Sequence, residues 1–161
     1  MPLLDGAALV YCADAYRTGR TAFTRFVAQH GITVLVCVPS FLRALERPEL
    51  PSLRILLVAG EPADVRDTRH FAATTTVING YGPTEAAILA TTYEATADDN
   101  RSRVPIGPPL PGTSAFVLDR FGRLAPIGVP GELWLGGAGL ADGYWNNESA
   151  TSARFGTVPV L

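Results

Sequence analysis

Short apolar stretches alternate with amphipathic or charged stretches through the first part of the chain. The apolar stretches are rich in aliphatic and β-branched residues, which predicts strands, at residues 7–11, 32–38, 55–59 and 74–78. Helices are predicted at residues 21–30, 39–45 and 62–71. The first has apolar residues at helical spacing, the second has that spacing and begins with a proline suited to a first helical turn, and the third is dominated by charged residues. We expect strands 32–38 and 55–59 to be buried. The alternation predicts a parallel sheet with right-handed crossovers and flanking helices, an α/β fold.

The pattern changes across residues 96–103, after which strands are separated by Pro-Gly turns. Strands are predicted at residues 114–119 and 132–135, on either side of a turn. We therefore expect an antiparallel, barrel-like β piece here. The predicted division is an α/β subdomain at residues 1–99 and a β-rich subdomain at 100–161.

A glycine-rich segment at residues 136–143 follows the second of these strands. Its spacing is Gly-x-Gly-x-x-x-Gly, which is not the dinucleotide-binding spacing, and no clear helix follows it. We interpret its glycines as turn residues that support the fold.

The run at residues 78–85, Ile-Asn-Gly-Tyr-Gly-Pro-Thr-Glu, places polar side chains directly after a predicted buried strand. In open α/β sheets, ligands bind beyond the carboxyl ends of strands. Tyr81 can stack on a nucleobase, Thr84 can hydrogen-bond a phosphate oxygen, and Glu85 is a hard oxygen ligand suited to Mg²⁺. The alternative is a strand and a Gly-Pro turn after which Thr84 and Glu85 merely begin a helix.

Composition narrows the class of protein. The 161 residues carry a net charge of −2, which argues against a nucleic-acid surface. No apolar run has the length of a membrane span and the start is not a signal peptide, so we expect a cytoplasmic chain. Cys12 and Cys37 are expected to be packing residues, and we assign no metal site beyond nucleotide magnesium. The apolar fraction, 47%, is high enough to predict a surface that another part of a larger protein covers.

The run at residues 79–85 resembles the Asn-x-Tyr-Gly-Pro-Thr-Glu signature of adenylation domains in nonribosomal peptide synthetases, members of the adenylate-forming, AMP-binding superfamily. Residues 131–144 are similar to the family's Gly-Glu-Leu stretch that ends in Gly-Tyr. Intervening and upstream segments follow the family's order, at residues 34–41, 56–61, 104–109, 117–119 and 126–131. The resemblance covers about residues 3–155. It implies part of the large nucleotide-binding subdomain followed by part of the β-rich subdomain, truncated at both ends.

The resemblance also implies roles for individual residues. Tyr81 would stack on adenine, with Gly60 and Glu61 as the opposite wall and Asn79 offering its amide to the adenine edge. Thr84 would contact the α-phosphate and Glu85 the magnesium, so these two are the candidate catalytic residues. The expected nucleotide-binding set is Gly60, Glu61, Asn79, Gly80, Tyr81, Gly82 and Thr84. For Glu61 an alternative is a helix-start carboxylate near Asp64, favoured by the helix dipole.

The family's amino-acid pocket maps to six apolar or small residues: Val36, Leu57, Ala59, Gly80, Ile88 and Leu89. Such a lining favours a hydrophobic amino acid, because an unpaired charge is costly in apolar surroundings. The alternative is that these are ordinary core residues of strands.

The reaction that the resemblance implies is ATP-dependent activation of an amino acid to aminoacyl-AMP, followed by transfer to a phosphopantetheine thiol on a carrier domain. The family's phosphate loop, its ribose-binding aspartate and its catalytic lysine have no counterpart here, and all 13 basic residues counted as Lys or Arg are arginine. We therefore expect a central fragment that is inactive unless a partner chain supplies the rest. The alternatives are a non-catalytic nucleotide-binding or synthetase-docking module, a gene remnant, or a fragment of a coenzyme-A ligase.

Overall fold

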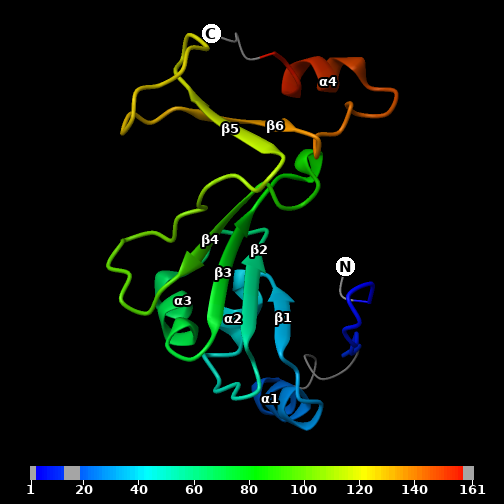
Figure 1. Cartoon of the computed structure of the whole chain (residues 1–161), viewed down its shortest axis with the longest axis vertical. Coiled ribbons are helices and arrows are strands. Elements are labelled where there is room, and N and C mark those ends of the chain that lie inside the picture. Colours follow the sequence, from blue (N-terminus) through cyan, green and yellow to red (C-terminus); the bar gives the residue numbers. More distant parts are fainter. Residues whose placement is uncertain (1–2, 13–18, 158–161) are drawn as a thin grey trace. The chain divides into compact units, whose positions relative to one another are not determined.

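The computed structural model describes residues 3–12 and 19–157 (Figure 1). The chain divides into two compact units that are interleaved in sequence. We call Met1–Asn79 with Glu94–Pro105 the sheet unit, and Gly80–Tyr93 with Ile106–Leu161 the hairpin unit. The predicted subdomain division between residues 99 and 100 stays a prediction.

The main sheet has the strand order β1-β2-β3-β4. Its strands are β1 (Val34–Cys37), β2 (Ile55–Ala59), β3 (Thr76–Tyr81) and β4 (Thr91–Ala95). β1 and β2 are parallel, with Val34 opposite Ile55 and Cys37 opposite Val58, which confirms the predicted parallel pairing. β4 was not predicted. The chain turns back before it, since the Ala90 N–H donates to the Tyr81 carbonyl at 2.8 Å.

The described residues of the sheet unit form three helices: α1 (Arg20–Gln29), α2 (Pro39–Ala44) and α3 (Val65–Ala72). All three confirm predicted helices. Pro39 occupies the first turn of α2, where its missing N–H costs nothing. The Asp64 carboxylate caps α3 by accepting from the backbone N–H groups of Arg66 at 2.8 Å and Asp67 at 3.3 Å.

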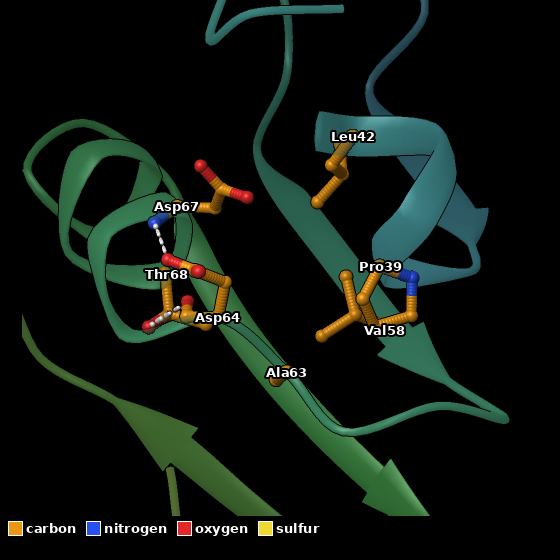
Figure 2. Close-up of a pocket in the computed structure, with 7 residues that line it drawn as sticks. All are labelled: Pro39, Leu42, Val58, Ala63, Asp64, Asp67 and Thr68. Carbon is orange, nitrogen blue, oxygen red and sulfur yellow. Dashed lines mark hydrogen bonds between the residues drawn. The ribbon is translucent and has the colours of Figure 1, made fainter. Parts of the chain in front are cut away.

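Helices cover one face of the sheet, and the opposite face, called the bare face below, exposes side chains of β1 among the described residues. α2 and α3 pack against Val58 on the covered face (Figure 2), where Leu56, Val58 and Val77 are at most 1% exposed. On the bare face Val34 is 52% and Val36 66% exposed. The expectation that residues 32–38 form a buried strand is therefore wrong for these side chains, because alternate residues of a strand point to opposite faces.

A second prediction also needs correction. Residues 7–11 were expected to form a strand, but these described residues are not in a strand. Leu9 is 73% and Tyr11 85% exposed. Apolar composition alone produced that prediction, and without a pairing partner an isolated apolar segment gains no strand structure.

The hairpin unit contains the antiparallel pair β5 (Thr113–Leu118) and β6 (Glu132–Gly137), which confirms the predicted antiparallel piece. Between them, the Asp119 carboxylate accepts from the N–H groups of Phe121 at 2.8 Å and Arg123 at 3.0 Å, forming the predicted turn. The unit also holds the 3₁₀ turn η1 (Thr84–Ala86) and helix α4 (Glu148–Arg154). α4 was not predicted. In the described part of the chain, no helix is long and apolar enough to cross a membrane.

Candidate functional site

Glu85 lies in η1, which begins after the extended Pro83. Its carboxylate oxygen Oε1 accepts a hydrogen bond from the Tyr144 hydroxyl, and its backbone carbonyl accepts from the Ala141 N–H at 2.8 Å. The Tyr144 hydrogen bond lowers the pKa of Glu85 below its usual value, and the same bond raises the pKa of Tyr144. At neutral pH the pair is therefore a neutral phenol that donates to an ionised carboxylate.

Gly82 is a glycine because the chain folds tightly back on it. A Cβ at this position would lie 2.5 Å from the Ile88 carbonyl oxygen and 2.7 Å from the Ala90 nitrogen. The return of the chain uses left-handed backbone at Ala87, with φ 54°, and at Ile88, with φ 77°. Positive φ is costly for a β-branched residue such as Ile88, so the loop holds a conformation that its neighbours impose.

Tyr81 and Thr84 are accessible on this loop. Tyr81 ends β3 and is 38% exposed, and Thr84 is exposed at the start of η1. β3 runs through Asn79, Gly80 and Tyr81, three residues beyond the predicted strand end at residue 78. The hairpin unit thus presents an aromatic ring, a hydroxyl and a carboxylate on one continuous stretch of chain.

Glu61, in the sheet unit, has both carboxylate oxygens engaged by one residue. Oε2 accepts from the Ser40 N–H at 2.9 Å and Oε1 accepts from the Ser40 hydroxyl at 2.8 Å. Val38, the residue before α2, supplies no side-chain cap, so Glu61 satisfies the N-terminus of α2 from outside the helix. The alternative interpretation of Glu61 was a carboxylate at the start of the helix near Asp64. Glu61 does lie at a helix N-terminus, but that helix is α2, whereas Asp64 caps α3. Gly60 beside it has a φ of 87°, which glycine adopts freely.

Asn79 is 4% exposed, and its side-chain nitrogen donates to the Pro105 carbonyl at 2.7 Å. This bond ties β3 to the segment that closes the sheet unit. Its role at an adenine edge stays a prediction.

The six residues expected in the amino-acid pocket fall into two groups. Val36 and Leu57 are opposite one another in the β1–β2 register, and Ala59 follows on the same face of β2, so the sheet unit brings these three together. Gly80, Ile88 and Leu89 belong to the hairpin unit, where Gly80 is buried and Ile88 is 74% exposed.

A small cavity in the sheet unit is separate from all of these residues. It measures about 10 Å³, room for about one water. Its lining comes from α2, β2, α3 and the turn before α3 (Figure 2): Pro39, Leu42, Val58, Ala63, Asp64, Asp67 and Thr68. None of the predicted site residues lines it, so it belongs to the packing of the covered face.

Other groups that could bind a metal ion or react as a nucleophile were also considered in the described part of the chain. Within residues 3–12 and 19–157, no three His, Cys, Asp or Glu side chains are grouped to hold an ion. Burial raises the pKa of the Cys37 thiol to about 12, which makes it unreactive at neutral pH. That behaviour agrees with the prediction that Cys37 is a packing residue.

Comparison with known proteins identifies the family. The sequence model described as AMP-binding enzyme matches residues 1–145. The chain belongs to the family of AMP-binding enzymes. Within it, the chain corresponds to part of an adenylation domain of the nonribosomal-peptide-synthetase type, so the resemblance drawn from the motifs is confirmed.

Its relatives in sequence are much longer proteins. Gramicidin S synthase 1 of Brevibacillus brevis is 35% identical over 155 residues, which are 96% of this chain and 14% of that protein. Tyrocidine synthase 1 of Brevibacillus parabrevis is 34% identical over 156 residues, which are 96% of this chain and 14% of that protein. Malpibaldin synthetase of Mortierella alpina is 38% identical over 163 residues, which are 96% of this chain and 3% of that protein.

Solved structures confirm the fold of the chain. The nonribosomal peptide synthetase FmoA3 matches with a TM-score of 0.88 and 27% identity, over 98% of this chain and 18% of that one. The four-domain synthetase AB3403, solved with AMP and glycine, matches with a TM-score of 0.84 and 30% identity, over 96% of this chain and 12% of that one.

Two residues of the site were missed in the sequence. Tyr144 contacts Glu85, and Ser40 contacts Glu61, yet each lies far from its partner in the chain. The resemblance of residues 131–144 to the family's stretch that ends in Gly-Tyr could have indicated Tyr144. Nothing in the pattern singled out Ser40.

Proposed function

We propose that this chain carries part of the magnesium–nucleotide site of an amino-acid-adenylating enzyme. Tyr81 stacks on adenine, Thr84 contacts the α-phosphate and Glu85 binds the magnesium ion. The observation that carries the proposal is the stretch from the end of β3 through η1, on which Tyr81 and Thr84 are accessible while hydrogen bonds to both side chain and backbone fix Glu85.

The donor set suits Mg²⁺ and no metal that needs a cage of protein ligands. Mg²⁺ is commonly held by one or two carboxylates, with substrate phosphates and water completing its shell. Glu85 offers one carboxylate, of which Oε1 accepts from Tyr144. When bound, the ion supplies positive charge that stabilises the phosphate oxygens.

The reaction proposed for the larger enzyme has two steps. An oxygen of the amino-acid carboxylate attacks the α-phosphorus of ATP and pyrophosphate leaves, giving aminoacyl-AMP. A phosphopantetheine thiol on a carrier domain then attacks the acyl carbon, and AMP leaves. Since no residue of this sequence is lysine, a catalytic ammonium group would come from outside these 161 residues.

We also propose nucleotide-binding roles for three residues of the sheet unit. Gly60 and Glu61 form a wall of the adenine pocket and Asn79 lies at the adenine edge. The proposed substrate is a hydrophobic amino acid, because the six pocket residues carry no charge or hydrogen-bonding side chain. The bare-face residues Val36, Leu57 and Ala59 support this proposal, since they leave an apolar surface open to a ligand.

The test is calorimetric titration of the 161-residue chain with ATP and with an aminoacyl-adenylate analogue, in the presence and absence of Mg²⁺. Tyr81→Ala is expected to weaken binding under both conditions, since base stacking is worth about 1–3 kcal/mol. Glu85→Ala is expected to abolish only the gain from Mg²⁺. Glu49→Ala, which removes an exposed carboxylate elsewhere, serves as the control. A folded protein that binds neither ligand would contradict the proposal and favour an interaction module.

A further inference from the structure

The side chain of Tyr144 contacts Glu85, the proposed magnesium ligand. Tyr144 ends the Gly-Glu-Leu stretch at residues 131–144. We propose that Tyr144 is a positioning residue that orients the Glu85 carboxylate toward a divalent cation. The inference rests on the proposed function, in which Glu85 is the metal ligand. It assigns a role to the glycine-rich segment that turn formation alone does not explain.

The segment before Tyr144 follows η1 closely. Ala141 donates its N–H to the Glu85 carbonyl at 2.8 Å. A Cβ placed on Gly139 would lie 3.8 Å from both the Ala86 carbonyl oxygen and the Ala87 Cβ, which is ordinary contact distance. Backbone and side chain of Glu85 are thus both held by the same short segment, Gly139 to Tyr144.

Tyr144 is itself held from the side of α4. Its N–H donates to the Thr151 hydroxyl at 2.9 Å, and its ring packs edge-on against Phe155 with centroids 5.7 Å apart. Gly143 has a φ of 150°, and a Cβ there would lie 2.6 Å from Thr151 Cγ2. Only glycine allows the chain to pass this close to α4, so Gly143 and Thr151 together fix the direction from which the Tyr144 hydroxyl approaches Glu85.

The chemistry of this arrangement is that of an outer-shell hydrogen bond. Carboxylates that bind metal ions are commonly oriented by a second hydrogen bond, and removal of that partner typically costs 10–100-fold in metal affinity. A donor on Oε1 restricts rotation of the carboxylate and leaves Oε2 for the ion. The rival possibility is competition, in which Tyr144 occupies the oxygen that the ion needs, and it predicts the opposite change in affinity.

The experiment measures metal binding at Glu85 directly, with Mn²⁺ alone as the probe. The ¹³C-carboxylate resonance of Glu85 is followed in the full chain while Mn²⁺ is added, because paramagnetic broadening reports proximity without requiring nucleotide or turnover. The variants are Tyr144→Phe, which removes the hydroxyl and keeps the ring on Phe155, and Thr151→Val, which removes the acceptor behind Tyr144. Tyr11→Phe, a change at a tyrosine that is 85% exposed, is the matched control.

We expect half-maximal broadening in Tyr144→Phe to need about 10-fold more Mn²⁺ than in the wild type, with an unchanged unfolding temperature. Thr151→Val should give a smaller shift in the same direction, and it decides the question if Tyr144→Phe does not fold. Equal broadening in wild type and variant, tighter binding in the variant, or no broadening of Glu85 in the wild type would each overturn the inference. A parallel ATP titration separates the two proposals, since a folded wild type that broadens with Mn²⁺ but binds no ATP contradicts only the proposed function.

Discussion

Glu61 and Glu85 are both carboxylates of the predicted nucleotide site, but their hydrogen-bond partners indicate different roles. Ser40 engages both oxygens of Glu61, whereas Tyr144 engages Oε1 of Glu85. Because both oxygens of the Glu61 carboxylate already accept hydrogen bonds at the N-terminus of α2, its role is structural. A ligand beside Glu61 would contact the side chain by packing and would not coordinate its oxygens. Glu85 is the better candidate for a metal ligand.

Glu61→Ala should therefore destabilise the protein. Loss of a side-chain cap costs about 0.5–2 kcal/mol, and we expect a fall of about 1 kcal/mol in the free energy of unfolding, measured by urea denaturation. Ser40→Ala should lower stability too, and the double variant should lose less than the sum of the two, because both changes break the same contact. Additive losses would contradict the pairing.

Gly82→Ala tests the tight return of the signature loop. The new methyl group would overlap the backbone of Ile88 and Ala90, so we expect a loss of about 1–3 kcal/mol in the free energy of unfolding. Gly136→Ala is the control, since its Cβ would lie 3.7 Å from Ser114 Cβ and alanine is favoured over glycine in a strand by about 0.5–1 kcal/mol. If both variants were equally stable, the close approach at Gly82 would be refuted.

Among the elements, those that carry their own local signals were predictable. α2 begins with a proline, α3 has an aspartate cap, and β2 is a short aliphatic run. β4 was missed because much of its support is tertiary: Thr92 N–H donates to the Pro108 carbonyl at 3.2 Å, and β4 lies beside β3. α4 was missed because none of its residues is buried, so no apolar stripe marks it in the sequence.

In the candidate site, too, the residues with a local sequence signal were predictable and the contacts between distant residues were not. Tyr81, Gly82, Thr84 and Glu85 lie together in one short motif, so sequence alone could place them on one loop. The contacts that fix Glu61 and Glu85 join positions 21 and 59 residues apart, and spacing in the chain carries no information about such pairs.

The cap of α3 gives a pH-dependent prediction at the element scale. Burial tends to raise the pKa of Asp64, but the N–H groups of Arg66 and Asp67 and the Arg66 guanidinium outweigh it, so the pKa is lowered from 3.8. Because the folded-state pKa lies below the unfolded one, this stabilisation is complete above the unfolded value and is lost as the pH falls through the folded value.

Asp64→Asn keeps a good capping residue but removes the titration. We expect the free energy of unfolding to fall more steeply in the wild type than in the variant as the pH drops below about 4, with parallel behaviour above about 5. Urea denaturation across this range measures it. Identical pH profiles for the two proteins would show that Asp64 contributes no linked stability.

For the molecule as a whole, the bare face of the sheet is the feature with the clearest consequence in solution. Val34 and Val36 expose apolar side chains beside Ile55, which is 37% exposed. Apolar surface of this kind is normally covered in a stable monomer. We expect the isolated chain to bind the dye 8-anilinonaphthalene sulfonate in its native state.

Val34→Thr combined with Val36→Thr should reduce dye fluorescence while changing the free energy of unfolding by about 0.5 kcal/mol or less, because exposed positions tolerate the hydroxyl. Val58→Thr on the covered face should instead cost about 1–3 kcal/mol, since its hydroxyl would be buried. Unchanged fluorescence in the double variant would place the dye elsewhere.

The interleaving of the two units limits how this protein can be cut. The chain passes from one unit to the other after residues 79, 93 and 105, so the first crossing falls inside the signature motif between Asn79 and Gly80. A truncation at any single position removes a segment from at least one unit and cannot release both intact. Neither half of a truncated chain would therefore test the proposed nucleotide binding fairly, and point substitutions are the better way to test it.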